Sequence, residues 1–123
     1  MDSGARILIV DDNIDAADLT ADVLRMYGLD VSVAYGGVDG LAAARASAPG
    51  LIFLDLGMPG MDGYQVAMAL RADINCCDIK IVALTAWGDA HARERTTAAG
   101  FDLHLTKPAP LATLVDIART AGH

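Results

Sequence analysis

Short apolar runs alternate along this chain with longer segments of helical periodicity, and this alternation constrains the fold more than any other feature. Five runs, the last less clearly than the others, are too short for helices and are rich in β-branched residues. They comprise residues 6–10, 31–34, 51–54, 79–84 and 101–105. Runs of this length with almost no polar residue are typical of strands buried on both faces of a parallel sheet.

The intervening segments predict helices. They comprise residues 14–27, 38–46, 64–72, 89–99 and 111–121. In the first of them, one broad apolar face is expected from Ala17, Leu19, Val23, Leu24 and Met26. Asp12 or Asn13 can cap its start, and Gly28 can end it.

A strand followed by a helix, repeated five times, favours the α/β class. Parallel strands are joined by right-handed crossovers, which place helices on both faces of the sheet. We therefore expect a flavodoxin-like (βα)5 doubly wound parallel sheet with strand order 2-1-3-4-5. Residues 1–123 carry no linker, internal repeat or low-complexity tract and are expected to form one domain.

Composition excludes several classes of function. The chain has 123 residues, 54% of them apolar and 20% charged, which argues against disorder. Its net charge of −7, with nine scattered Lys and Arg, argues against direct nucleic-acid binding and favours a cation partner. There is neither a membrane-length apolar stretch nor a signal peptide, so we expect a cytoplasmic location. The adjacent Cys76 and Cys77 are interpreted as ordinary thiols.

Polar residues follow four of the five apolar runs. They are Asp11 and Asp12 after the first, Asp55 after the third, Thr85 after the fourth and Lys107 after the fifth. In an open α/β sheet, ligands bind beyond the carboxyl ends of the strands. Taken singly, each aspartate can be a helix cap and the lysine a solvated side chain. Together they predict a site at one edge of the sheet.

The chemistry of such a site follows from its charges. Carboxylates held close together repel one another unless a cation is bound, and Mg²⁺ favours hard oxygen ligands together with a phosphate oxygen. A carboxylate can itself act as a nucleophile and form an aspartyl-phosphate. Asp55 is the best candidate because its strand is central, while Lys107 and Thr85 could hold phosphoryl oxygens.

These residues make the chain resemble the receiver domain of two-component response regulators over almost its whole length. The matching motifs are Ile7-Leu8-Ile9-Val10-Asp11-Asp12, Leu54-Asp55-Leu56-Gly57-Met58-Pro59-Gly60-Met61-Asp62-Gly63, Ala83-Leu84-Thr85-Ala86 and Lys107-Pro108. The spacing agrees too, with Thr85 30 residues after Asp55 and Lys107 22 residues after Thr85.

The resemblance implies that Asp55 takes a phosphoryl group from a histidine kinase or a histidine phosphotransfer protein. Mg²⁺ would be bound by Asp11, Asp12, Asp55 and the backbone carbonyl of Gly57. Thr85 and Lys107 would hold the phosphoryl oxygens, and the Lys107–Pro108 peptide bond would be cis.

The resemblance also implies a switch rather than an enzyme with a substrate to turn over, since such a domain loses its own phosphoryl group slowly. Phosphorylation would change a partner-binding surface built from residues 89–99, 101–105 and 111–121, and the downstream target is unknown. The chain would be a stand-alone receiver or part of a longer protein, and similarity to receivers of hybrid histidine kinases favours the second.

Three positions depart from the family pattern. Gly57 has no side chain where many relatives carry a polar one, although a backbone ligand survives this change. Trp87 lies two residues after Thr85, and we hypothesise that its indole hinders water attack and lengthens the phosphoryl lifetime. His104 stands where the family usually has an aromatic switch residue, so it is either a surface histidine without a signalling role or a replacement for that switch.

Two alternatives remain open. A degenerate receiver would bind its partner without phosphorylation, and Asp55→Asn would leave that binding unchanged. A small α/β enzyme is the other class. A haloacid-dehalogenase-type phosphatase needs a second aspartate where this chain has Gly57. A nucleotide or flavin binder needs a glycine-rich loop after the first strand, and no such loop follows it here.

Overall fold

The computed structural model describes residues 6–86 and 90–120. Its strands are β1 (Ile7–Val10), β2 (Val31–Ala34), β3 (Leu51–Asp55), β4 (Lys80–Thr85) and β5 (Leu103–Thr106). Its helices are α1 (Ile14–Met26), α2 (Gly37–Ser47), α3 (Gly63–Ala72), α4 (Ala90–Ala99) and α5 (Leu111–Thr120). Strand and helix alternate throughout, as the sequence predicts.

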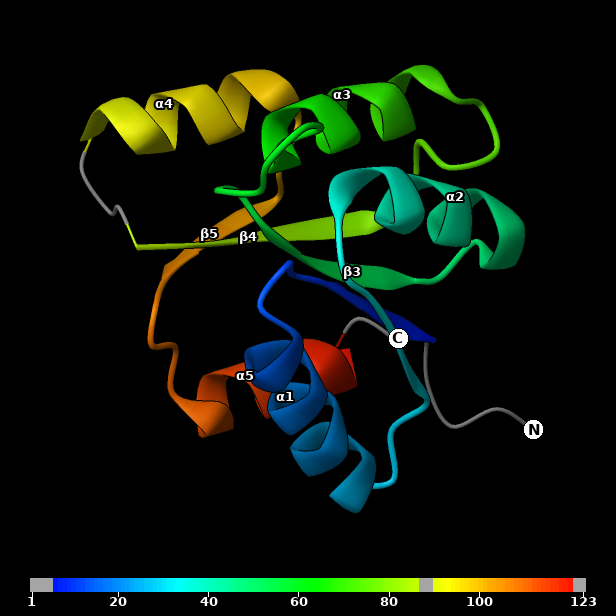
Figure 1. Ribbon diagram of the computed structural model, residues 1–123, viewed down its shortest axis with the longest axis vertical. Coiled ribbons are helices and arrows are strands. Elements are labelled where there is room, and N and C mark those ends of the chain that lie inside the picture. The colour runs from blue at the N-terminus through cyan, green and yellow to red at the C-terminus, as the bar shows by residue number, and fades with distance from the viewer. Residues whose placement is uncertain (1–5, 87–89, 121–123) are drawn as a thin grey trace.

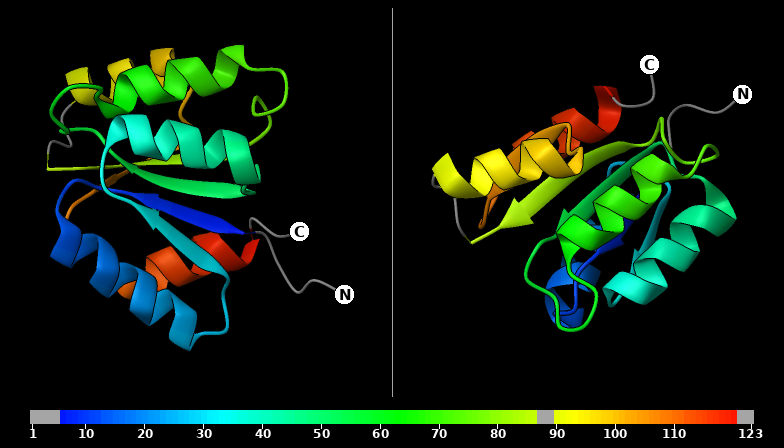
Figure 2. Two further views of the ribbon diagram at one scale, coloured as in Figure 1. Left: turned by 45° about the vertical axis from the view of Figure 1, so that its right-hand side comes forward. Right: turned by 90° about the horizontal axis from the view of Figure 1, so that it is seen from above.

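Within the described residues, the strands form one sheet in the order β2-β1-β3-β4-β5, and every neighbouring pair is parallel. Helices α1 and α5 cover one face of this sheet, and α2, α3 and α4 cover the other (Figures 1 and 2). This three-layer arrangement confirms the predicted flavodoxin-like doubly wound fold.

The side chains of the central strands divide into two cores by strict alternation. Along β1, Ile7 and Ile9 pack with α1 and α5, whereas Leu8 and Val10 pack with α2 and α3. Phe53 of β3 belongs to the first core and is fully buried. Because successive side chains of a strand point to opposite faces, a strand covered on both faces must be apolar throughout.

Two expectations about element details are wrong. Leu19 and Met26 do not belong to the buried face of α1, since they are 67% and 83% exposed; that face consists of Ala17, Ala21 and Leu24. The fifth strand begins at Leu103 rather than at residue 101. The two preceding residues instead fix the strand's entry, because Phe101 packs into the core and the Asp102 carboxylate accepts from the amide of Ile81 at 2.8 Å.

Side chains at the helix starts define where the site-bearing loops end. Asn13, rather than Asp12, caps α1 by accepting from the amide of Ala16 at 3.1 Å. At α3, Asp62 and Gln65 form a capping box in which each side chain accepts from the backbone amide of the other at 2.9 Å. The segment that carries Asp12 is therefore fixed where it joins α1, and the segment that follows Asp55 is fixed where it joins α3.

Arg71 joins three segments at the end of the sheet where the strands begin, opposite the carboxyl ends of the strands that carry the candidate site. Its guanidinium donates to the carbonyls of Gly100, Cys77 and Ile79 at 2.8, 2.9 and 2.6 Å, and to the carboxylate of Asp102 at 2.9 Å. Charge-assisted hydrogen bonds are stronger than neutral ones. Arg71 thus fastens the end of α3 to the starts of β4 and β5.

We predict that Arg71→Met lowers the free energy of unfolding by about 2–3 kcal/mol, because the change leaves backbone carbonyls without their charged donor. Arg45→Met is the matched control, since its ion pair with Asp73 at 3.2 Å is on the surface and half of the Arg45 side chain is exposed. Urea denaturation of both variants tests this. Equal losses in the two variants would contradict it.

No helix within residues 6–86 and 90–120 is long and apolar enough to cross a membrane. The thiols of Cys76 and Cys77 are free, and Cys76 is buried.

Candidate functional site

The carboxyl ends of four strands bring the predicted site residues to one edge of the sheet. Asp11 directly follows β1, and Lys107 directly follows β5. Asp55 and Thr85 are the last residues of β3 and β4, whereas the sequence predicted each of them one position beyond the end of its strand. Parallel register sets this edge, with Val10 beside Leu54 and Thr85 beside Thr106.

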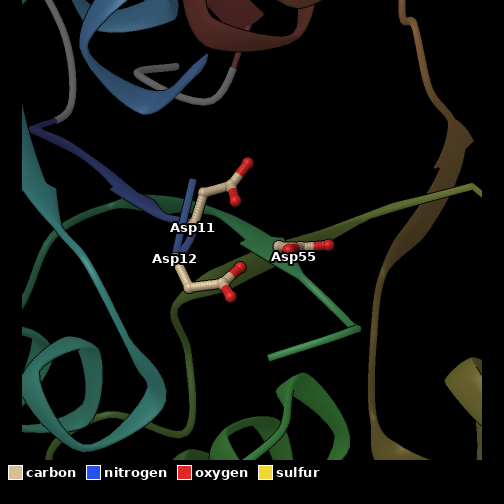
Figure 3. A group of neighbouring side chains, drawn as sticks. All are labelled: Asp11, Asp12 and Asp55. Atoms are coloured by element: carbon tan, nitrogen blue, oxygen red, sulfur yellow. The ribbon is translucent and has the colours of Figure 1, made fainter. Parts of the chain in front are cut away.

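Three carboxylates gather at this edge (Figure 3). Oxygen atoms of Asp11, Asp12 and Asp55 all lie within 4.8 Å of one another. Asp11 and Asp55 are buried, whereas Asp12 is exposed. A set of hard oxygen donors with one side open to solvent suits Mg²⁺, which prefers such ligands and retains several waters. The residues present therefore fit a magnesium ion.

Backbone contacts hold the two buried carboxylates in place. The amide of Asp11 donates to the carbonyl of Ala34 at 3.1 Å, and the Asp11 carboxylate accepts from the amide of Asn13 at 2.9 Å. The Asp55 carboxylate accepts from the amide of Gly57 at 3.4 Å. Each carboxylate is thus tied to the loop that follows it.

Lys107 is the cation that these carboxylates share within the described structure. Its ammonium donates to Asp11 at 2.9 Å and lies 3.5 Å from Asp55. Burial lowers the pKa of Lys107, but the hydrogen bond that its ammonium donates to Asp11 and the negative charges of Asp55 and Asp11 outweigh this effect, so the net pKa is raised. Lys107 consequently stays protonated at neutral pH.

One ammonium does not balance three carboxylates. Burial raises the pKa of Asp55 above its ordinary value of 3.8, and the charge of Asp11 raises it further, although Lys107 and the Gly57 amide act in the opposite direction. The ionised form of Asp55 is therefore disfavoured in the folded chain until another cation arrives. Among the described residues, the ion pairs of Lys107 thus leave the cluster with excess negative charge, which a bound cation would balance.

Thr85 lies beside this group and is buried, with 1% of its surface exposed. Its backbone carbonyl accepts from the amide of Lys107 at 2.7 Å, which fixes the start of the loop after β5. The peptide bond between Lys107 and Pro108 is cis, as the resemblance implies. The end of β4 and the shared lysine are thus parts of one connected edge.

The structure brings Asp11, Asp12, Asp55 and Lys107 into direct proximity, as the sequence predicts. Gly57 is exposed two residues beyond β3, and its carbonyl remains a predicted ligand. Trp87, to which the sequence assigns a role in phosphoryl lifetime, lies outside the described residues.

His104 is tied to α4, a contact that the sequence did not indicate. Its Nδ1 lies 3.1 Å from the hydroxyl of the buried Thr96, and that hydroxyl donates to the carbonyl of Arg93 at 2.9 Å. His104 is half-buried and links β5 to α4; a signalling role for it stays a prediction.

The capping box of α3 is a second feature that was not predicted from the sequence. The pattern Asp62-Gly63-Tyr64-Gln65 carries its signature, an acidic cap with glutamine three residues later. It matters for the site because it anchors the far end of the segment that follows Asp55.

The raised pKa of Asp55 gives a prediction for the chain without divalent cations. Between 3.8 and the higher folded-state pKa, the folded chain binds more protons than the unfolded chain, so the free energy of unfolding falls as the pH rises through this window. The cost is fully present once the pH exceeds the folded-state pKa. Asp55→Asn should then raise the free energy of unfolding, because it removes the partly buried charge.

This gain should shrink as the pH is lowered toward 3.8, because Asp55 is then neutral in both states. Urea denaturation across pH 4–7 in the presence of a chelator measures it. The exposed Asp116 provides the control Asp116→Asn. A lower free energy of unfolding in Asp55→Asn, or an increase that does not depend on pH, would contradict the conclusion that the ionised form of Asp55 is disfavoured in the folded chain.

Comparisons with known proteins agree with this geometry. Residues 7–119 match the family described as the response regulator receiver domain. Among curated proteins, the DNA-binding dual master transcriptional regulator RpaA of Synechocystis sp. is 42% identical over 103 residues, which are 84% of this chain and 43% of that protein. The transcriptional regulatory protein PrrA of Mycobacterium tuberculosis is 38% identical over 118 residues, which are 94% of this chain and 50% of that protein.

Solved structures show the same fold. The chemotaxis protein CheY4 of Vibrio cholerae superposes with a TM-score of 0.89 at 27% identity, covering 96% of this chain and 98% of that one. The signal receiver domain of a histidine kinase from Syntrophus aciditrophicus gives a TM-score of 0.86 at 26% identity, covering 95% and 89% of the two chains.

The chain spans about half the length of the curated relatives it matches. The match over residues 7–119, the fold and the acidic edge together show that the chain belongs to the response regulator receiver domain family.

Proposed function

We propose that this chain is a phospho-acceptor switch in which Asp55 takes a phosphoryl group from a histidine kinase or a histidine phosphotransfer protein in a reaction that requires Mg²⁺. The observation that carries the proposal is the placement of Asp55. It is a buried carboxylate at the end of the central strand, beside Asp11 and Asp12 and within 3.5 Å of the Lys107 ammonium.

In the proposed reaction, a carboxylate oxygen of Asp55 attacks the phosphorus atom of the donor. An oxygen–phosphorus bond forms, and the bond between phosphorus and the donor's histidine nitrogen breaks. Bound Mg²⁺ would supply positive charge to the phosphoryl oxygens. Asp11, Asp12, Asp55 and the backbone carbonyl of Gly57 would hold it.

Lys107 is placed to follow the charge as it moves. Before transfer its ammonium lies between Asp11 and Asp55. After transfer, the Asp55 oxygen in the new bond no longer carries a full charge, whereas the phosphoryl group carries about two negative charges. Lys107 and the Thr85 hydroxyl would therefore bind phosphoryl oxygens.

The switch would act through the elements attached to Thr85 and Lys107. These are β4 and β5 together with the helices that follow them, and the predicted partner-binding surface consists of α4, β5 and α5. Moving an equilibrium from mostly inactive to mostly active takes about 5 kcal/mol of differential stabilisation. Several charge-assisted hydrogen bonds to one phosphoryl group are of this size in total. The only reactions proposed for the chain itself are its own phosphorylation and the slow loss of that group.

The chain is also proposed to act in the cytoplasm on a protein partner. A cytoplasmic location would give access to a kinase, and the net charge of −7 argues against direct contact with nucleic acid. DNA binding is stated of relatives of which this chain matches about half. The downstream partner would thus be a protein, or another part of a longer chain.

Incubation with acetyl phosphate tests the acceptor directly. We predict that the intact mass rises by one phosphoryl group in the presence of Mg²⁺, that a chelator abolishes the gain, and that Asp55→Asn abolishes it as well. Lys107→Met should slow the gain by about 100-fold or more, since it removes a charge that stabilises the developing phosphoryl oxygens.

Phosphorylation of Asp55→Asn to the same extent as the unchanged chain would contradict the proposal. No gain under any condition would favour a degenerate receiver that binds its partner without phosphorylation.

Magnesium binding can be tested apart from phosphorylation. Asp12→Asn should weaken Mg²⁺ binding at least about tenfold, because it removes a charged ligand from the cluster. Asp116→Asn makes the same change of charge on the exposed side of α5 and should leave binding within about twofold. Calorimetric titration of both variants measures this, and equal affinities would contradict the assignment of Asp12.

A further inference from the structure

Three glycines occupy the first turn of α2 and the residue before it. They differ in what a β-carbon would meet at each position. At Gly36 it would meet nothing within 4 Å. At Gly40 it would meet the side chain of Val10, and at Gly37 it would overlap the backbone carbonyl oxygen of Met61. Gly37 is therefore the position where α2 lies directly on the backbone of another segment.

The contact at Gly37 is hard to relieve. Gly37 is buried, and an added β-carbon would also lie 2.9 Å from the carbonyl carbon of Met61 and 3.0 Å from its Cβ. A flexible side chain could turn away, but a backbone carbonyl moves only with its segment. Any side chain at residue 37 must therefore displace either the start of α2 or the segment that contains Met61.

The segment in question, residues 56–62, runs from the phospho-acceptor strand to α3. Its near end is held where the Leu56 amide donates to the carbonyl of Leu84 at 3.2 Å. Its far end is held by the capping box of Asp62, and the Gly63 amide donates to the Leu56 carbonyl at 3.2 Å. Between these two ends lies Gly57, whose carbonyl is a predicted Mg²⁺ ligand. The contact with Gly37 supports the same stretch through Met61.

We propose that Gly37 is a positioning residue for the metal site. By allowing α2 to lie against the Met61 carbonyl, it sets the path of residues 56–62 and with it the position of the Gly57 carbonyl beside Asp55. The inference rests on the proposed function, since it assumes that this edge of the sheet binds Mg²⁺. It adds a residue from an element that provides no ligand.

Adjacent glycines provide a matched test. Gly37→Ala should weaken Mg²⁺ binding about tenfold, the usual effect of disturbing a group that positions a metal ligand. Gly36→Ala should leave the affinity within about twofold, because its β-carbon meets open space and its φ of 179° is accessible to any residue. Mg²⁺ titration followed by amide resonances gives both constants, and the resonances of residues 56–62 should differ from those of the unchanged chain in Gly37→Ala.

A loss of stability alone must not produce the same result. Ala44→Gly weakens α2 at a buried position away from the contact, so it should lower the urea midpoint without changing the Mg²⁺ affinity. Equal affinities of Gly37→Ala and the unchanged chain would overturn the inference. So would an equal loss of affinity in Ala44→Gly.

The unchanged chain provides a test that survives a Gly37→Ala variant unable to fold. Coupling between two sites is reciprocal, so Mg²⁺ should stabilise the first turn of α2. The Gly40 amide donates to the Gly36 carbonyl at 2.8 Å in that turn, and the Ala48 amide donates to the Ala44 carbonyl at 2.8 Å at the opposite end of the helix. Mg²⁺ should slow hydrogen exchange of the Gly40 amide several-fold more than that of Ala48. Equal effects on the two amides would overturn the inference.

These outcomes separate the inference from the function on which it rests. If the unchanged chain binds no Mg²⁺, the metal site is wrong and the role of Gly37 is wrong with it. If the unchanged chain binds Mg²⁺ and Gly37→Ala binds it equally well, only the role of Gly37 is wrong.

Discussion

The structure has an excess of negative charge at its candidate site. One ammonium, that of Lys107, pairs with the carboxylates of Asp11 and Asp55, and the carboxylate of Asp12 belongs to the same cluster. Such a group costs stability in an isolated chain, and it persists because its members are fixed at the ends of three strands, with Asp11 and Asp12 after β1, Asp55 at the end of β3 and Lys107 after β5. The same imbalance would give the site its proposed chemistry. A bound cation would relieve the repulsion, and in the proposed reaction a phosphoryl group would find Lys107 already in place. The charges that lower the stability of the isolated chain are therefore the ones that the proposed function requires.

The rest of the fold serves to hold that edge. Two apolar cores clamp the central strands from both faces, so the strand ends cannot separate to relieve the repulsion. At the amino-terminal ends of the strands, Arg71 ties α3 to the starts of β4 and β5. Near the site, Gly37 and Gly63 allow α2 and α3 to begin against backbone atoms, Gly63 lying on the carbonyl of Asp55 itself. The loops that carry the ligands are short and supported on both sides.

The sequence predicted the strand order and the group of acidic residues, because both follow from simple regularities. Short buried runs indicate parallel strands, and residues that follow such runs meet at one edge. It could not predict contacts that depend on how elements pack. The exposure of Leu19 and Met26 reflects the narrow contact of α1 with the sheet. The bond between His104 and Thr96 joins β5 to α4, and no local pattern indicates it. The close approach of Gly37 to the backbone of Met61 likewise depends on how α2 packs and has no local pattern that indicates it.

The free energy of unfolding as a function of Mg²⁺ concentration tests the central claim most directly. If the carboxylates of Asp11, Asp12 and Asp55 form a cation site whose repulsion Mg²⁺ relieves, millimolar Mg²⁺ should raise this free energy in proportion to the logarithm of its concentration once the site saturates. NaCl at matched ionic strength should not reproduce the rise, and removing the Asp12 carboxylate should reduce it. Equal effects of Mg²⁺ and NaCl on the unchanged chain would contradict the account, because the acidic edge would then be only a screened surface charge.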